Sequence, residues 1–272
     1  ISMSTNLFFW NVRGLNDPKK HSPLSQWLLS QKPVFGALLE THIKETQLSY
    51  VMSKACRDWN FCSNHNSDTD GRIVLIWKSP ADVRLISQSK QAITCEVSIS
   101  TSYKFIFTAI YASNENEDRQ DLWVELLNIH QSLALDSGPW ILGGDLNQII
   151  HPAEHSSPSI ISLTPQMSSL RNVLTQLGVF DLRFLGPLFT WTNKCPSAPV
   201  AEKLDRLLVN QQWISTFPHS LATFLPPDFS DHSPCLIDLS VPLPIAGTRP
   251  FKFFNYLTKH HKFNRTLEEA WI

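Results

Sequence analysis

The sequence predicts an α/β fold with sheets packed between helices, and three features support this prediction. Apolar runs typical of strands alternate with helix-like segments throughout the 272 residues. The run 103–111 is apolar at both odd and even positions, as expected for a strand that is covered on both faces. Between residues 118 and 135, apolar side chains recur three and four positions apart, which indicates an amphipathic helix.

The first part of the chain is predicted to form three strands and two helices. A strand over residues 6–10 ends at Asn11, and Ser22-Pro23 is a plausible cap and first position of a helix. A buried strand over 34–39 ends at Glu40, and a helix is expected over 45–58. A third strand is predicted over 71–77. The first two strands therefore each deliver a polar side chain to a sheet edge.

The stretch 139–147 is the most informative part of the sequence. Its apolar run 140–142 predicts a buried strand, and Gly143-Gly144 is expected to end it. Asp145 and Asn147 follow two positions apart, so in an extended chain both side chains project from one face. Ligands commonly bind at the carboxyl ends of strands in α/β sheets, which makes this pair a candidate site. An ordinary Asx turn is the alternative explanation.

The last part of the chain is predicted to contain one helix and three strands. The helix covers 166–177 and stops at Gly178, and the strands cover 189–193, 203–209 and 234–239. Pro242 and Pro244 mark a boundary near residue 241. We therefore expect one domain over 1–240 and a linker segment over 241–272.

Composition narrows the class of protein. The net charge of −1 gives no overall sign of a nucleic-acid binder. Basic residues exceed acidic ones only in the tail after residue 241, so the body is acidic, as suits a carboxylate metal site. The five cysteines are scattered and odd in number, which favours free thiols in a reducing compartment. The sequence shows neither a signal-peptide pattern nor an apolar run long enough for a membrane span, so no membrane partner is expected.

Acids, amides and one histidine recur at predicted strand ends, and each has an ordinary explanation when taken alone. Asn11 could be a turn residue, Tyr111 a half-buried core aromatic, and Asp205 a partner for its neighbour Arg206. The strand ends of a closed two-sheet core can nevertheless converge on one rim. The candidates are Asn11, Glu40, Tyr111, Asp145, Asn147, Asp205, Asp231 and His232.

Seven motifs occur in order over residues 5–240, and together they resemble the endonuclease/exonuclease/phosphatase superfamily. They are Trp10-Asn11-Val12-Arg13-Gly14, Leu39-Glu40-Thr41, Ile110-Tyr111-Ala112-Ser113-Asn114, Gly143-Gly144-Asp145-Leu146-Asn147, Phe189-Thr190-Trp191-Thr192-Asn193, Lys203-Leu204-Asp205-Arg206 and Ser230-Asp231-His232-Ser233-Pro234. Within the superfamily the sequence looks most like the apurinic-endonuclease-like domain of plant LINE-type (non-LTR) retrotransposons. The tail segment 249–256 is similar to the part of those polyproteins that leads toward a reverse transcriptase.

The resemblance implies a DNase I-like four-layer α/β sandwich, in which two mainly antiparallel or mixed sheets lie face to face with helices outside. It also implies phosphodiester hydrolysis with Mg²⁺ or Mn²⁺. Glu40 would hold the metal with Asn11 close by, and Asp231 would belong to the metal side of the site.

The resemblance also implies roles for the other candidates. Asp145 would take or orient the proton of the attacking water, while Asn147 and Tyr111 would position water and phosphate. His232 would contact the scissile phosphate, with its ring oriented by Asp205. One departure is His42, at a position where members of the family often carry lysine after Glu-Thr.

The implied product is a nick in one strand of double-stranded DNA, with a 3′-hydroxyl that primes reverse transcription and a 5′-phosphate. The implied partners are the DNA target, a C-terminal reverse transcriptase domain and the element RNA, and the implied location is the nucleus. Arg72, Thr190 and Trp191 are the candidate DNA contacts. Arg72 could equally be an ordinary surface residue, and Trp191 a core one.

Two other functions fit the same motifs. The first is a phosphodiesterase or phosphatase of the same fold acting on RNA, an inositol phosphate or a lipid. The second is a catalytically silent, element-derived remnant that only binds nucleic acid.

Overall fold

The computed structural model describes residues 6–100, 103–240 and 258–270. Contacts between Cα atoms divide the chain into two compact units, Ile1–Val241 and Pro242–Ile272. Within the second unit, residues 263–270 form the helix α6 (Phe263–Ala270), whose side chains are largely exposed. Segment 249–256, on which the expectation of a following reverse transcriptase rests, lies outside the described residues.

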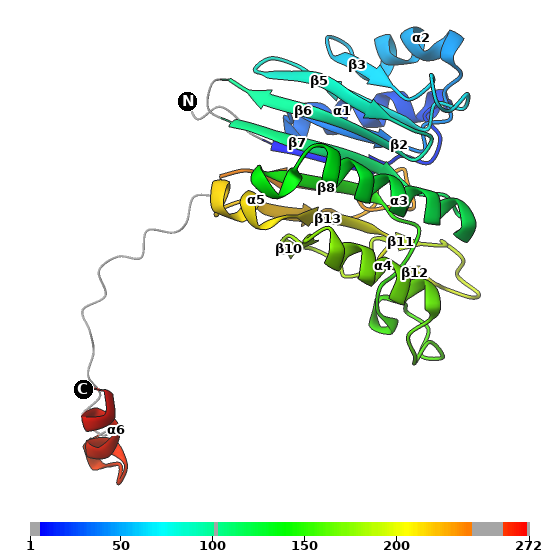
Figure 1. Cartoon of the computed structure of the whole chain (residues 1–272). Coiled ribbons are helices and arrows are strands. Elements are labelled where there is room, and N and C mark those ends of the chain that lie inside the picture. Colours follow the sequence, from blue (N-terminus) through cyan, green and yellow to red (C-terminus); the bar gives the residue numbers. More distant parts are fainter. Residues whose placement is uncertain (1–5, 101–102, 241–257, 271–272) are drawn as a thin grey trace. The chain divides into compact units, whose positions relative to one another are not determined.

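Two sheets make up the larger unit (Figure 1). The first has the order β10-β14-β15-β1-β2-β4-β3, and the second β5-β6-β7-β8-β13-β9. A short pair, β11-β12, stands apart from both. In the first sheet the strands are β10 (Phe184–Leu185), β14 (Leu221–Phe224), β15 (Cys235–Asp238), β1 (Asn6–Asn11), β2 (Phe35–Leu39), β4 (Ile73–Trp77) and β3 (Asn60–Ser63). In the second they are β5 (Ala81–Gln88), β6 (Ala92–Ile99), β7 (Tyr103–Tyr111), β8 (Trp140–Asp145), β13 (Asp205–Val209) and β9 (Phe180–Asp181), and the pair is β11 (Trp191–Thr192) with β12 (Ala201–Glu202).

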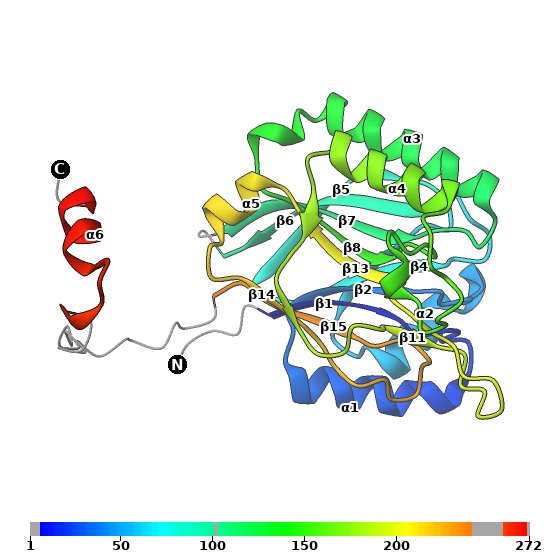
Figure 2. The same cartoon turned by 90° about the horizontal axis from the view of Figure 1, so that it is seen from below.

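Helices cover the outer faces of both sheets, so that the unit has four layers (Figure 2). An apolar cluster joins α1 (His21–Gln31) and α2 (Glu45–Ala55) to the first sheet, and another joins α3 (Asn116–Ser132) and α4 (Pro165–Gln176) to the second. A third cluster fills the space between the sheets. The shorter elements are α5 (Gln211–Thr216), η1 (Pro18–Lys20), η2 (Leu135–Ser137) and η3 (Pro152–Glu154).

Strand β1 shows why the sequence folds in this way. Leu7 and Phe9 face the cluster between the sheets, while Phe8 and Trp10 face the cluster beneath α1 and α2. Both faces of the strand are thus apolar, and each large side chain that is fully buried contributes about 1.5–3 kcal/mol. The predicted α/β class, with two mixed sheets and outer helices, is confirmed by this arrangement.

Strand register brings the polar strand ends of each sheet together. In the second sheet, β7 pairs with β8 in parallel, and Tyr111 is opposite Asp145. Strand β13 pairs with β8 antiparallel, and Asp205 is also opposite Asp145. In the first sheet, β1 pairs in parallel with β2, so Asn11 ends level with Leu39, just before Glu40.

Several predicted boundaries are wrong. The helix expected over 45–58 ends at Ala55, and the strand expected over 189–193 is only β11. Strand β8 continues through both glycines to Asp145. At Gly144, where φ is +154°, a Cβ would lie 1.9 Å from the carbonyl oxygen of Ile110, so the glycine allows the close approach of β7 and does not end the strand. Helix α1 begins at His21, ahead of the predicted Ser22 cap, because the turn η1 leads directly into it. No helix in the described residues has both the length and the apolar character needed to cross a bilayer.

Candidate active site

A hollow of about 300 Å³ lies where polar strand ends of the two sheets meet. Five of the side chains that line it are polar residues singled out in the sequence, namely Glu40, Tyr111, Asp145, Asn147 and His232. Trp191, a candidate DNA contact, also lines the hollow, together with Arg13, Asn114, Glu202 and Leu204. Asn11 and Asp205 are fully buried against these residues.

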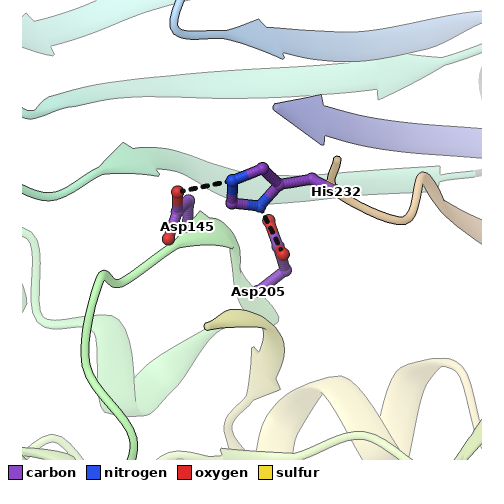
Figure 3. Close-up of side chains that lie close together, drawn as sticks. All are labelled: Asp145, Asp205 and His232. Carbon is purple, nitrogen blue, oxygen red and sulfur yellow. Dashed lines mark hydrogen bonds and ion pairs between the residues drawn. The ribbon is translucent and has the colours of Figure 1, made fainter. Parts of the chain in front are cut away.

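His232 lies between two buried carboxylates (Figure 3). Its Nδ1 is 2.9 Å from Oδ2 of Asp205, and its Nε2 is 3.8 Å from Oδ2 of Asp145. The backbone of the histidine is also fixed, because Trp10 donates its indole N–H to the His232 carbonyl oxygen at 3.0 Å. The ring therefore has a defined orientation with one nitrogen toward each acid.

Burial and mutual charge shift the acid–base behaviour of this cluster. Burial, together with the charge of Asp205, raises the pKa of Asp145 to about 6, although the charge of His232 opposes the rise. Burial alone would lower the pKa of His232, but the charges of Asp205 and Asp145 and the hydrogen bond to Asp205 raise it to about 9. At neutral pH the ring is therefore a cation, while Asp145 is mainly ionised and can accept a proton.

Asn11 connects the two sheets across the hollow. Its Nδ2 donates to Oε2 of Glu40 at 3.0 Å and to Oδ2 of Asp145 at 2.9 Å. Its amide oxygen accepts a hydrogen bond from the backbone N–H of Arg13 at 3.0 Å. Glu40 and Asp145 are thus held in fixed positions by one buried amide.

Glu40 and Asn147 both have left-handed backbone conformations, with φ of +52° and +45°. Such conformations are unfavourable for residues other than glycine, and they are concentrated at functional sites. Here they turn the chain at the ends of β2 and β8, so that each side chain faces the hollow. Asn147 also donates its backbone N–H to Oδ1 of Asp145 at 2.9 Å and its amide N–H to the carbonyl oxygen of Ala112 at 2.7 Å.

Tyr111 reaches the hollow from the end of β7 and is largely buried. Burial raises its pKa well above the ordinary value, and the nearby charges of Glu40 and Asp145 add to the shift. The phenol therefore stays protonated over the physiological range and is available as a hydrogen-bond donor.

Asp231 lies beside His232 but is already held by two donors. Its Oδ2 accepts a hydrogen bond from the guanidinium of Arg13 at 2.5 Å and from the indole N–H of Trp191 at 3.0 Å. Sequence reasoning did not select Arg13, although the motif Trp10–Gly14 contains it. The only available signal was its position two residues after Asn11, in a segment that must turn at Gly14.

The three candidate DNA contacts differ in their surroundings. Arg72 forms ion pairs with Asp68 and Asp70, and its guanidinium carbon is 5.9 Å from the ring centre of Tyr111. Thr190 is buried, and its hydroxyl accepts the backbone N–H of Asp205 at 2.9 Å. In this conformation Thr190 therefore positions Asp205. Trp191 is half-buried and lines the hollow.

Two sets of groups in the site could hold a metal ion. Asp145, Asp205 and His232 offer ligand atoms that all lie within 4.8 Å of one another. Alternatively, Glu40 presents a carboxylate at the hollow, and its Oε1 is 3.5 Å from Nε2 of His42. Carboxylate oxygen is the donor that hard divalent cations prefer.

Comparisons with known proteins identify the family and the fold. Residues 8–232 match the model of the Endonuclease/Exonuclease/phosphatase family. No curated protein sequence matches the chain significantly. Among solved structures, the endonuclease domain of TRAS1, a telomere-specific non-LTR retrotransposon, is similar with a TM-score of 0.66 and 10% identity, covering 86% of this chain and 97% of that one.

Two further structures share the fold. The AP endonuclease LMAP from Leishmania major has a TM-score of 0.70 and 16% identity, with 88% of each chain covered. The D. rerio TDP2 structure, complexed with a single-strand DNA product, has a TM-score of 0.59 and 17% identity, covering 87% of this chain and 98% of that one. These likenesses cover 86–88% of this chain. Because the family model also spans most of the chain, from β1 to His232, the chain belongs to the endonuclease/exonuclease/phosphatase family.

Proposed function

We propose that the chain is a divalent-metal-dependent endonuclease that hydrolyses one phosphodiester of double-stranded DNA, leaving a 3′-hydroxyl and a 5′-phosphate. The observation that supports this most strongly is one continuous network, in which Asn11 joins Glu40 to Asp145, and His232 lies between Asp145 and Asp205. Such a network provides a carboxylate for a cation, a proton acceptor and a fixed positive charge around one hollow.

Members of this family usually use a divalent metal, and we assign its place to Glu40. The alternative group of Asp145, Asp205 and His232 is less suitable, because its polar atoms already bind one another and Asn11: Nδ1 of His232 is 2.9 Å from Oδ2 of Asp205, and Asn11 donates to Oδ2 of Asp145 at 2.9 Å. A cation at Glu40 would supply Lewis-acid polarisation of the phosphate. Asn11 and Asp231 remain the neighbouring candidates, Asn11 through its contact with Glu40.

The remaining residues handle the proton and the charge of the phosphate. Asp145 accepts or orients the proton of the attacking water, for which a pKa of about 6 is suitable near neutral pH. Asn147 and Tyr111 position water and phosphate as hydrogen-bond donors. His232, charged and oriented by Asp205, stabilises the negative charge that develops on the phosphate oxygens.

The biological setting that we propose is the nicking step of a non-LTR retrotransposon. The 3′-hydroxyl would then prime reverse transcription in the nucleus by a reverse transcriptase domain with the element RNA. The ordered motifs support this setting, and the likeness to the TRAS1 endonuclease domain is compatible with it at the level of the fold.

Incubation with supercoiled plasmid and Mg²⁺ tests the activity. We expect conversion to the relaxed form, which DNA ligase should reseal because the nick carries a 3′-hydroxyl and a 5′-phosphate. Glu40→Gln and Asp145→Asn should each abolish nicking. Turnover of RNA, a phosphoinositide or a lipid with intact plasmid would instead identify a phosphodiesterase or phosphatase of the same fold. Binding of DNA without turnover of any of these would identify a silent remnant.

A further inference from the structure

The hollow has two neighbouring surfaces of opposite charge. On one side are Arg13, Lys20 and Lys194, which we call the cationic rim. Burial lowers the pKa of Lys20, and the nearby charge of Lys194 acts in the same direction. The charges of Asp17, Asp231 and Glu40 oppose this shift. Lys20 contacts the backbone of Arg13, and Lys194 follows Thr192, whose backbone is hydrogen-bonded to Asp231, so both lysines lie on segments that flank the Arg13–Asp231 pair.

Backbone hydrogen bonds fix the rim against the site. Nζ of Lys20 donates to the carbonyl oxygen of Val12 at 2.8 Å and to that of Arg13 at 2.5 Å. Lys194 comes two residues after Thr192, whose backbone N–H donates to the carbonyl oxygen of Asp231 at 3.2 Å. The cations are thus attached to the same two segments that carry Asn11 and His232.

The positive charge of the rim is only partly compensated. Arg13 is paired with Asp231, and its side chain remains 52% exposed. Within the part of the chain that the structure describes, neither Lys20 nor Lys194 forms a salt bridge with a carboxylate. An anion that approaches this rim therefore meets two lysines that it does not have to separate from a carboxylate, together with Arg13, which is already paired with Asp231.

The second surface is a groove of about 680 Å³, and Tyr111 lines both this groove and the hollow. Five carboxylates line the groove, against the two cations Arg72 and Lys90. Arg72 is itself paired with two of these carboxylates. Its Nε is 3.3 Å from Oδ2 of Asp68, and its Nη2 is 3.5 Å from Oδ2 of Asp70. The carboxylates are those of Asp68, Asp70, Asp118, Asp121 and Glu125.

We infer that the cationic rim binds the DNA backbone beside the scissile phosphate, and that the acidic groove repels it, so that the cleaved strand crosses the hollow along the Arg13 side only. Each phosphate contacted by a lysine or arginine releases counterions, whereas a phosphate in the acidic groove would meet uncompensated like charge. This inference rests on the proposed function and specifies how its DNA substrate is held. It also places the main phosphate contacts at Arg13, Lys20 and Lys194, and not at Arg72.

Binding of a short fluorescent duplex, measured by anisotropy in EDTA over a range of salt concentrations, tests the inference. Lys194→Ala and Lys20→Ala should each weaken binding severalfold, and should each reduce the slope of log affinity against log salt by about 0.9. Lys20→Arg should restore the slope, which separates loss of charge from loss of the backbone hydrogen bonds. Asp118→Asn combined with Asp121→Asn should tighten binding. Lys54→Ala, an exposed lysine change on α2, is the matched control and should leave the slope unchanged.

Slopes for the rim variants equal to that of Lys54→Ala would overturn the inference, as would wild-type protein that does not bind the duplex. A slope change with labelled RNA but none with duplex DNA would overturn DNA as the occupant. The plasmid assay on the same preparations keeps the two proposals apart. Nicking with unchanged rim slopes refutes the rim alone, whereas reduced slopes without any nicking refute the proposed activity alone.

Discussion

Asp145 and Asp205 are opposite each other on antiparallel strands β8 and β13, and His232 enters from the other sheet with one ring nitrogen toward each of them. Two carboxylates this close, at 1% and 0% exposure, repel each other strongly unless a cation lies between them. The histidine therefore has a structural role as well, because its positive charge offsets the repulsion between the two acids. Removing either the ring or one acid should change both catalysis and stability.

Asp205→Asn should slow nicking by about 10²–10⁴-fold, as in other sites where a buried carboxylate orients a catalytic histidine. Without the negative charge, the pKa of His232 falls from its raised value, so the high-pH limb of the activity profile should shift to lower pH. Plasmid nicking measured from pH 6 to pH 10 checks this. A uniform loss of rate with an unshifted limb would contradict it and would leave Asp205 with only a packing role.

The raised pKa of His232 also predicts how stability depends on pH. A histidine with a folded-state pKa of about 9 contributes stability that is fully present below its unfolded value near 6.5 and is lost as the pH rises through 9. The contribution is about 3 kcal/mol at most by linkage. Urea unfolding should therefore show that the free energy of unfolding falls more between pH 7.5 and pH 10 for wild type than for His232→Asn. Equal losses would mean that the imidazole is not held in its charged form.

Addition of Mg²⁺ should raise the free energy of unfolding, because a ligand that binds only the folded state stabilises it. The gain is about 2.7 kcal/mol at one hundred times the dissociation constant. If Glu40 holds the ion, Glu40→Gln abolishes this gain, while His232→Asn preserves it. The reverse pattern would place the ion in the cluster of Asp145, Asp205 and His232. Thermal shifts with Ca²⁺ in parallel separate specific binding from a general salt effect.

The sequence allowed the fold class and the polar residues at the ends of several strands to be predicted, because both depend on local patterns. The apolar alternation of β1 and β7 and the polar residue that ends each strand are visible over fewer than ten residues. Strands β5 and β6 were missed. In β5 only Ala81 is buried, and Arg84, Ser87 and Gln88 interrupt any apolar pattern. Strand β6 is mostly buried, but Thr94, Glu96 and Ser98 separate its apolar residues.

The site itself depends on contacts that no local pattern contains. Trp10 and His232 are 222 residues apart, and Arg13 and Asp231 are 218 apart, yet each pair forms a hydrogen bond. Order along the chain, read through the family resemblance, identified the residue types. It could not reveal that Asn11 bridges two acids, that Thr190 is buried, or that Arg13 is the cation beside Asp231, because these depend on side-chain geometry between sheets.

Gly144 is the residue at which the site depends most directly on backbone packing, and it gives the last prediction. A Cβ there would lie 1.9 Å from the carbonyl oxygen of Ile110 and 2.9 Å from its N, so β7 and β8 would have to move apart. We expect Gly144→Ala to lower the free energy of unfolding by about 3 kcal/mol or more, as for other changes that overpack a buried backbone.

Gly138→Ala is the matched control and should change stability by less than about 0.5 kcal/mol. Gly138 has extended backbone and no atom within 4 Å of the position that a Cβ would take. Because Tyr111 and Asp145 end these two strands, any Gly144→Ala protein that remains folded should also lose nicking activity. A variant with wild-type urea stability would show that the strands can separate without cost.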